Sequence, residues 1–227
     1  MHINRSSAAP QVPSDPADWR PQGYGRGFKG VRDAIVEPGW SGVRALARVE
    51  AGGIRLVDED GIDCTAEFAE VAAAIAGAAQ TGDIILDGFL TVEATQVVAG
   101  KPLVEIAATT SRQVMTQLVL GGLARPSVKP RRLDSDRPVA FVAIDVLRID
   151  GTPLLDIPLL ERKRLLEGAL IPSDLIRITP YVRAPIRTFL ETWRGMGFVE
   201  LAYKDPNSRY LPGRRNNDWS IKPIPTK

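Results

Sequence analysis

The sequence predicts an α+β fold built largely from antiparallel sheets, and three observations support this fold class. Apolar and polar residues alternate across residues 42–57, on both sides of Ala51-Gly52-Gly53, as in a β-hairpin. Residues 65–79 place apolar side chains at spacings of three and four, as in an amphipathic helix. Strands and helices then follow one another without the regular strand–helix–strand order of a parallel sheet.

The elements follow in chain order. Residues 1–27 are rich in Pro, Ser, Gly and Arg and lack hydrophobic periodicity, so we expect a flexible arm, ordered only around Trp19 and Tyr24. We expect residues 28–227 to form one domain, in which Thr65 is the N-cap of the helix at 65–79. The other elements that we predict are a strand at 83–92, a helix at 112–123, a basic connector at 129–137, a strand at 140–149, a helix at 159–170, a strand at 176–182, a helix at 184–196 and a strand at 198–203.

The composition restricts the classes of functional site that the chain can contain. The 227 residues include 29 Lys and Arg against 27 Asp and Glu, so overall charge does not by itself indicate a nucleic-acid partner. The single cysteine, Cys64, excludes an internal disulfide, and we interpret it as a packing residue. The single histidine, His2, excludes most catalytic triads and histidine-ligated metal sites, so we expect no metal. We find no secretion signal or membrane span and expect the cytoplasm.

Three segments carry a resemblance to a known family. Residues 204–219, KDPNSRYLPGRRNNDW, hold a Lys, a Ser-x-Tyr, a Pro-Gly-Arg-Arg and a Trp in register. In this they resemble the adenylation (nucleotidyltransferase) domain of ATP-dependent DNA ligases, particularly the bacterial end-joining type. Residues 145–166 resemble that family's D-L-L-x-L-D-G segment and its L-P-L-x-E-R-R-x-L-L helix, and IILDGFLTV resembles V-L-D-G-E-L-V. The resemblance covers residues 34–222 and implies a two-lobed, antiparallel-sheet nucleotidyltransferase fold (ATP-grasp-like). Since the family continues into an OB-fold domain and this sequence stops at Lys227, we expect the fold without the OB-fold domain.

The first motif of the family departs from the pattern here. In the family it is E-P-K-W-D-G-x-R-A-L, and its lysine attacks the α-phosphate of ATP to form a lysyl-AMP intermediate. Residues 37–46 are EPGWSGVRAL, with Gly39 at the lysine position, and glycine has no amine with which to form that bond. The other degenerate positions are Ser41 for an aspartate, Glu59 for an arginine, Phe89 for a glutamate, Ile144 for the aromatic that stacks on adenine, Val199 for the metal-associated glutamate, and Ile221 and Pro223 for two lysines. Glu200 lies one residue from Val199, the position of the lost glutamate, and Lys222 lies between Ile221 and Pro223, the positions of the two lost lysines.

Several basic residues are candidates for contacts with nucleic-acid phosphates, the alternative being a solvated surface. These candidates are Arg44, Lys129, Arg131, Arg132, Lys204, Arg209, Arg214 and Arg215. For Arg44 we favour an ion pair with Asp87 or Glu37 instead. Trp40 and Phe89 are expected to fill the core. The helix at 159–170 has charges on adjoining turns, and we interpret it as a salt-bridged surface.

We therefore expect a catalytically inactive, ligase-like adenylation domain, a pseudoenzyme that binds DNA or a DNA-repair or replication protein and needs no cofactor. Two alternatives stay open. In the first alternative, the domain is an active ATP-dependent DNA ligase or nucleotidyltransferase that uses a displaced lysine. The candidates for this lysine are Lys29, Lys204 and Lys222, and the cofactors are ATP and Mg²⁺. In the second alternative, the domain binds and senses a nucleotide without catalysing a reaction.

Overall fold

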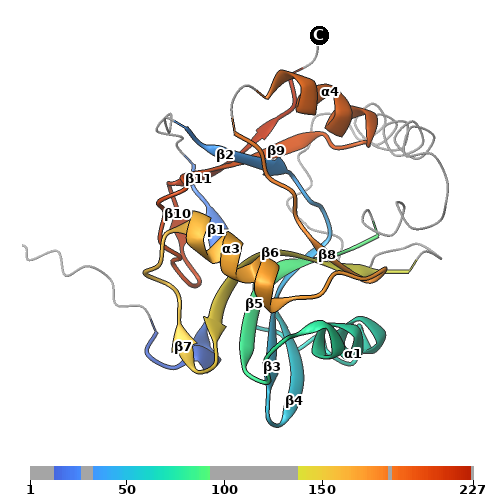
Figure 1. The fold of residues 1–227 in the computed structure, drawn as a ribbon, viewed down its shortest axis with the longest axis vertical. Helices are drawn as coiled ribbons and strands as arrows, with labels where there is room; N and C mark the ends of the chain where they lie inside the picture. The colour runs from blue at the N-terminus through green and yellow to red at the C-terminus, as the bar shows by residue number, and fades with distance from the viewer. Residues whose placement is uncertain (1–12, 27–32, 93–137, 184–185, 226–227) are drawn as a thin grey trace, which may run out of the picture.

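A computed structural model describes residues 13–26, 33–92, 138–183 and 186–225 (Figure 1). The predicted helix at 112–123 and the predicted basic connector lie outside the described residues, as do Lys29, Lys129, Arg131 and Arg132. Within the described residues the chain forms two lobes, each built on a sheet, and the α+β class is confirmed.

The larger sheet contains six strands, five of them in the order β4-β3-β5-β6-β7. These strands are β3 (Val43–Glu50), β4 (Gly53–Asp58), β5 (Ile84–Thr91), β6 (Ala140–Ile149), β7 (Thr152–Pro153) and β8 (Ile176–Ile178). Neighbours along the path are antiparallel, whereas β8 pairs with β6 in parallel. The predicted hairpin is confirmed as β3 and β4. The strand predicted at 176–182 is shorter and ends at Ile178.

The smaller sheet brings together segments from both ends of the chain. It consists of β2 (Ile35–Pro38), β9 (Glu200–Lys204) and β11 (Trp219–Pro223), with β9 in the middle and both pairings antiparallel. Beside it, β1 (Gly23–Tyr24) pairs in parallel with β10 (Arg215–Asn216). The residues around Trp19 and Tyr24, where we expected order in the N-terminal arm, are therefore part of the fold, while a boundary at residue 27 stays a prediction.

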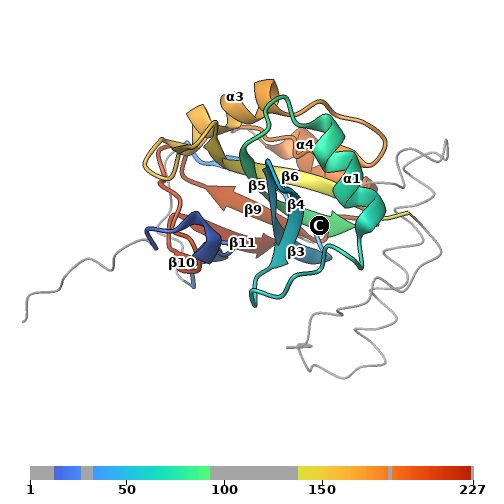
Figure 2. The same cartoon turned by 90° about the horizontal axis from the view of Figure 1, so that it is seen from below.

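Helices pack against both sheets. They are α1 (Ala69–Ala78), α3 (Leu159–Ala169) and α4 (Arg187–Gly195), preceded by the short 3-10 helix η1 (Pro16–Asp18). Figure 1 shows α4 against the smaller sheet and α1 beside β3 and β4, and Figure 2 shows α1 and α3 along the same side of the molecule. No helix in these described ranges is long and apolar enough to cross a membrane.

The first helix begins later than the sequence predicts. Residues 65–68 form turns, and α1 starts at Ala69 without a side-chain cap. Thr65 is not the N-cap because its Oγ1 accepts a hydrogen bond from the Leu56 amide at 2.8 Å, which ties the turn to β4. The hydroxyl therefore satisfies a strand amide instead of a helix amide.

Alternation along the strands divides the core into two layers. On β3, Ala45 and Ala47 face a cluster shared with α1 and α3, whereas Leu46 faces the opposite way. This opposite face of the larger sheet packs against the smaller sheet. The buried side chains between the sheets include Trp19, Ile35, Leu46, Ile85, Phe89, Ile144, Leu147, Leu155, Leu159, Tyr210 and Trp219. We call this layer the inter-sheet layer.

Gly88 allows β5 to approach β6 closely. The pairing of β5 with β6 shifts register beside Gly88, and a Cβ there would lie 2.4 Å from Phe141 Cζ and 2.5 Å from the Val142 carbonyl oxygen. We expect Gly88→Ala to lower the free energy of unfolding by about 1–3 kcal/mol, as overpacking does, when measured by urea denaturation. The control is Gly77→Ala in α1, where a Cβ meets nothing within 4 Å and should stabilise by about 0.5–1 kcal/mol. Equal midpoints for the two variants would contradict this account.

Candidate functional site

The position that lacks a lysine lies at the end of β2 with its backbone tightly packed. The Gly39 amide donates a hydrogen bond to the Glu200 carbonyl oxygen at 2.9 Å. A Cβ on Gly39 would lie 2.8 Å from both the carbonyl carbon and the carbonyl oxygen of Glu200, and 2.9 Å from its Cβ. Real Cβ atoms essentially never come within 3.0 Å of other heavy atoms, so any side chain at position 39 requires the backbone of β9 to move.

The strand register decides which side chains face the larger sheet. Directly paired residues of antiparallel strands point to the same face. Ile35, Lys204 and Trp219 are paired across the three strands, and because Ile35 and Trp219 belong to the inter-sheet layer, Lys204 points there too. Glu37 shares this face two residues further along β2.

Lys222 lies on the other face of the smaller sheet. It pairs with Leu201, which packs in the cluster beneath α4. Its Nζ lies 5.4 Å from the ring centroid of Tyr203, a residue that packs against the same cluster. In this register Ile221, and not Lys222, points toward the inter-sheet layer.

Arg44 forms the first buried ionic group of the inter-sheet layer. Its Nε and Nη2 donate to the two carboxylate oxygens of Asp87 at 2.9 and 2.6 Å, and both side chains are at most 4% exposed. The Tyr210 hydroxyl donates to the same carboxylate at 2.7 Å. Burial and the charge of Asp87 raise the pKa of Tyr210 well above its usual value, so it remains a donor. The favoured pairing of Arg44 with Asp87 is therefore present in the structure.

Arg162 forms a second ionic group of the same kind. It donates from Nε and Nη2 to Asp145 at 2.9 and 2.8 Å, and both side chains are fully buried. Its Nη1 donates to the Ser208 carbonyl oxygen at 3.1 Å. Because α3 carries Arg162 and β6 carries Asp145, this bidentate pair fixes the helix on the larger sheet and joins it to the loop after β9.

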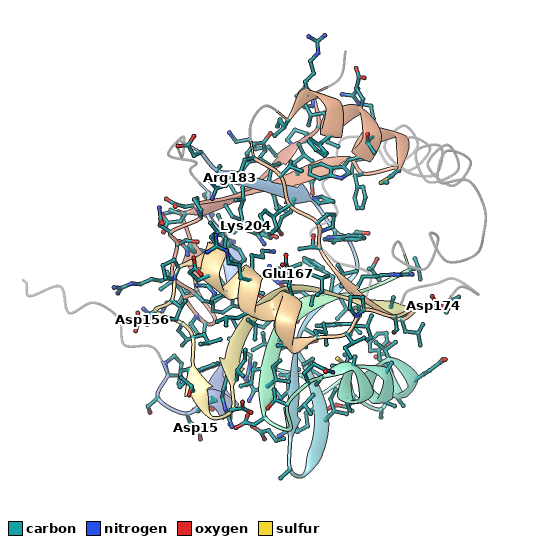
Figure 3. All side chains as sticks on the ribbon, viewed as in Figure 1. Asp15, Asp156, Glu167, Asp174, Arg183 and Lys204 are labelled. Atoms are coloured by element: carbon teal, nitrogen blue, oxygen red, sulfur yellow. The ribbon has the colours of Figure 1, made fainter. Side chains whose placement is uncertain are left out.

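A third ionic group has one carboxylate between two lysines. Lys204 Nζ donates to Glu37 Oε2 at 2.6 Å, and Lys163 Nζ lies 2.5 Å from Glu37 Oε1. The latter approach lacks the angles of a hydrogen bond, so we describe it as an ion pair. All three side chains are at most 1% exposed. Figure 3 shows Lys204 where α3 meets the smaller sheet. We call Glu37, Lys163 and Lys204 the Glu37 cluster.

Lys163 has the chemistry of an activated amine. Burial lowers its pKa to about 8, and the charge of Lys204 adds to this effect, whereas Glu37 opposes it. We did not identify Lys163 from the sequence because the charged helix at 159–170 was interpreted as surface. The exposed Glu161–Arg164 pair agrees with that interpretation, but Arg162 and Lys163 are buried. The sequence does contain one indication of this position, because the second arginine of the family pattern E-R-R is replaced by Lys163 in Glu161-Arg162-Lys163.

The degenerate positions lie in different environments. Phe89 and Ile144 are buried in the inter-sheet layer, and the Arg44 guanidinium lies 5.3 Å from the Phe89 ring centroid. Trp40 packs against the same layer, and its Nε1 donates to Thr179 Oγ1 at 2.8 Å. The remaining positions are closer to solvent: Ser41, Glu59 and Val199 are exposed and Ile221 is half-buried.

The basic candidates also separate into buried and exposed residues. Arg44 and Lys204 are held in the buried ion pairs above, which argues against the phosphate contacts that we considered for them. Arg209 and Arg215 are exposed and Arg214 is half-buried. Arg209 pairs with Asp156, itself exposed, at 3.3 Å. Figure 3 shows Asp156 at the edge of the molecule, well away from α4.

Metal ligation has no obvious basis in the described part of the chain. There, no three His, Cys, Asp or Glu residues are grouped in a way that could hold a metal ion.

Comparisons with known proteins agree with one another on the family. The profile of the ATP-dependent DNA ligase domain matches residues 26–222. A DNA ligase of Methanothrix thermoacetophila is 27% identical over 195 residues, which are 83% of this chain and 32% of that protein. A probable DNA ligase of Streptomyces griseus is 30% identical over 200 residues, which are 84% of this chain and 36% of that protein. The chain thus spans about a third of the length of these relatives.

Solved structures agree with the fold. The ligase domain from M. tuberculosis LigD superposes with a TM-score of 0.63 at 23% identity, covering 92% of this chain and 60% of that one. Mycobacterial DNA ligase D complexed with ATP and MES gives a TM-score of 0.61 at 24% identity, covering 91% and 60%. At these identities the likeness shows the fold alone.

The unequal charges of the Glu37 cluster lead to a stability prediction. Glu37→Gln would leave two buried ammonium groups without a carboxylate, and we expect it to lower the free energy of unfolding by about 3–5 kcal/mol. Lys163→Met, which is similar in length, leaves Glu37 with Lys204 alone and should be neutral or stabilising. Urea denaturation of both variants measures these changes. A larger loss for Lys163→Met than for Glu37→Gln would contradict the shared-carboxylate arrangement.

Proposed function

The chain belongs to the ATP-dependent DNA ligase domain family, and from this premise we propose that it is a member that has lost the adenylation chemistry. In this proposal the domain is a pseudoenzyme. It acts as a binding module for DNA or for a DNA-repair or replication protein, and its proposed location is the cytoplasm.

The packing of Gly39 is the observation that carries the proposal. Loss of a nucleophile by a single substitution would leave an empty place for the missing side chain. At position 39 the Glu200 backbone lies where a side chain would begin. Both the amine and the room for it are therefore missing, which supports an inactive domain better than the sequence change alone.

Other positions of the family's motifs also fit ATP and Mg²⁺ poorly. The family positions that would supply two lysines hold Ile221 and Pro223, and the position of a glutamate holds Phe89, whose ring is buried against Arg44. An apolar side chain offers no ligand to a hydrated magnesium and no donor to a phosphate. We therefore propose that the domain acts without a nucleotide cofactor.

DNA is the partner that the family favours. The relatives reported above are named as DNA ligases, and an inactive member of such a family can retain the partner while losing the reaction. Arg209 and Arg215, both exposed, are the described candidates best placed to contact phosphates.

A second candidate function is supported by Lys163. Near pH 8 about half of its side chains carry a neutral amine, and a desolvated neutral lysine is a competent nucleophile. Its ion-pair partner Glu37 lies two residues before Gly39 on the same strand. An adenylation reaction on a displaced lysine would therefore use Lys163 more readily than Lys222, which faces α4. This candidate is tested together with the first.

We expect no covalent AMP when the full chain is incubated with α-labelled ATP and Mg²⁺ and then denatured, because no amine is available at position 39. Gly39→Lys should remain unlabelled as well, since its side chain has no room. An active ligase of the family is the positive control. A label on the wild-type chain that disappears in Lys163→Met would replace the first candidate by the second.

We expect binding to nicked duplex DNA in gel shifts, with affinity falling steeply as salt rises. Replacing both Arg209 and Arg215 by Ala should reduce the slope of log affinity against log salt by up to about 2, since each phosphate contact contributes about 0.9. The control replaces Arg55 and Arg164, two exposed arginines in ion pairs on other elements, by Ala. Equal loss in both double variants, or no binding by the wild-type chain, would contradict the DNA-binding proposal at these residues.

A further inference from the structure

The Glu37 cluster connects three elements that are distant in sequence. Glu37 belongs to β2, Lys204 to β9 and Lys163 to α3. The first two lie in the smaller sheet, whereas α3 is fixed to the larger sheet by the Arg162–Asp145 pair. The contact between Lys163 and Glu37 therefore joins the two lobes of the domain.

The charges of this cluster do not balance when both lysines are protonated. Arg44 and Arg162 each have a carboxylate of their own, Asp87 and Asp145. Glu37 faces two ammonium groups instead. A buried charge without a full counter-charge is costly, and a lysine can relieve that cost by releasing a proton.

The surroundings of the two amines show which of them would release it. Lys204 makes the hydrogen bond to Glu37, and its Nζ also lies 4.0 Å from the Trp219 ring centroid, so its charged form has two favourable partners. Lys163 has the ion pair with Glu37, a longer approach of 5.8 Å to the Tyr181 ring, and the charge of Asp145. Lys204, which faces it from β9, and Arg162, its neighbour on α3, are like charges.

We propose that the Glu37 cluster is a proton-controlled clasp between the lobes. With Lys163 protonated, two buried ammonium groups share the single Glu37 carboxylate, and this excess charge weakens the contact of α3 with β2. When Lys163 loses its proton, Glu37 and Lys204 remain as a balanced buried pair, and α3 packs more firmly against β2. The clasp does not depend on whether the domain forms an adenylate.

The direction of the pH effect follows from the lysine. The pKa of Lys163 is about 8 in the folded chain and near its usual value of 10.5 in the unfolded chain. Between these values the unfolded chain binds more protons, and so does an opened cluster in which Lys163 meets water. Both the global stability and the closure of the clasp therefore increase as the pH rises from about 8 toward 10. At one unit above the pKa about one-tenth of the Lys163 side chains remain protonated.

The test combines lysine NMR with amide hydrogen exchange of the full chain at pH 7 and pH 9, with exchange corrected for the intrinsic rates. We expect the Lys163 side-chain signal to titrate near pH 8, and amides of β2 and α3 to gain protection at the higher pH by several-fold. Lys163→Arg keeps its charge at both pH values and should show no such change. Lys163→Met should resemble the wild-type chain at pH 9 at both values.

A third variant tests the origin of the shift and guards against a substitution at 163 that fails to fold. Lys204→Met removes the competing ammonium, so the titration of Lys163 should move to higher pH. The clasp is refuted if wild-type and Lys163→Arg chains show the same pH dependence at β2 and α3. It is equally refuted if the Lys163 signal titrates at the pH of exposed lysines, or if Lys204→Met leaves its titration unchanged.

Discussion

The inter-sheet layer depends on the sharing of one buried carboxylate between two buried amines. Glu37 lies 2.6 Å from Lys204 and 2.5 Å from Lys163, so a single side chain links α3 to the paired strands β2 and β9. Beside it, Arg44 with Asp87 and Arg162 with Asp145 are balanced pairs whose bidentate geometry is rigid. These three groups place charge throughout a layer that is otherwise apolar, and each of them is desolvated. The balanced pairs fix the geometry of the layer, and the Glu37 cluster is the site in it whose protonation can change.

At position 39 the lysine side chain is absent, and the backbone of the neighbouring strand also leaves no room for one. The hydrogen bond from the Gly39 amide to the Glu200 carbonyl oxygen extends the β2–β9 pairing by one residue beyond Pro38. This extension brings the two backbones close enough to exclude a Cβ. A lysine at this position would thus need a change in the course of β9 in addition to a codon change.

Much of the fold could be predicted from sequence because local patterns determine it. The alternation in residues 42–57 requires a hairpin, and the buried run at 140–149 became β6 with the same bounds. The site could be predicted only in part. The position of Gly39 followed from the resemblance, but Lys163 did not, because Arg162, Lys163 and Arg164 are alike in sequence and only packing buries the first two. Arg44 and Lys204 show the same limit, since their partners Asp87 and Glu37 are distant along the chain.

The pairing of β1 with β10 has a consequence for how the domain is made. Gly23 and Tyr24 pair with Arg215 and Asn216, so the first of these segments cannot complete its pairing until the second, far along the chain, has been synthesised. The Tyr210 hydroxyl that accepts from the Gln22 amide at 2.8 Å adds to this delay. Contacts between such distant segments slow folding because a long loop must close first. During synthesis Trp19 and its neighbours therefore lack these partners until the residues around 215 have been made.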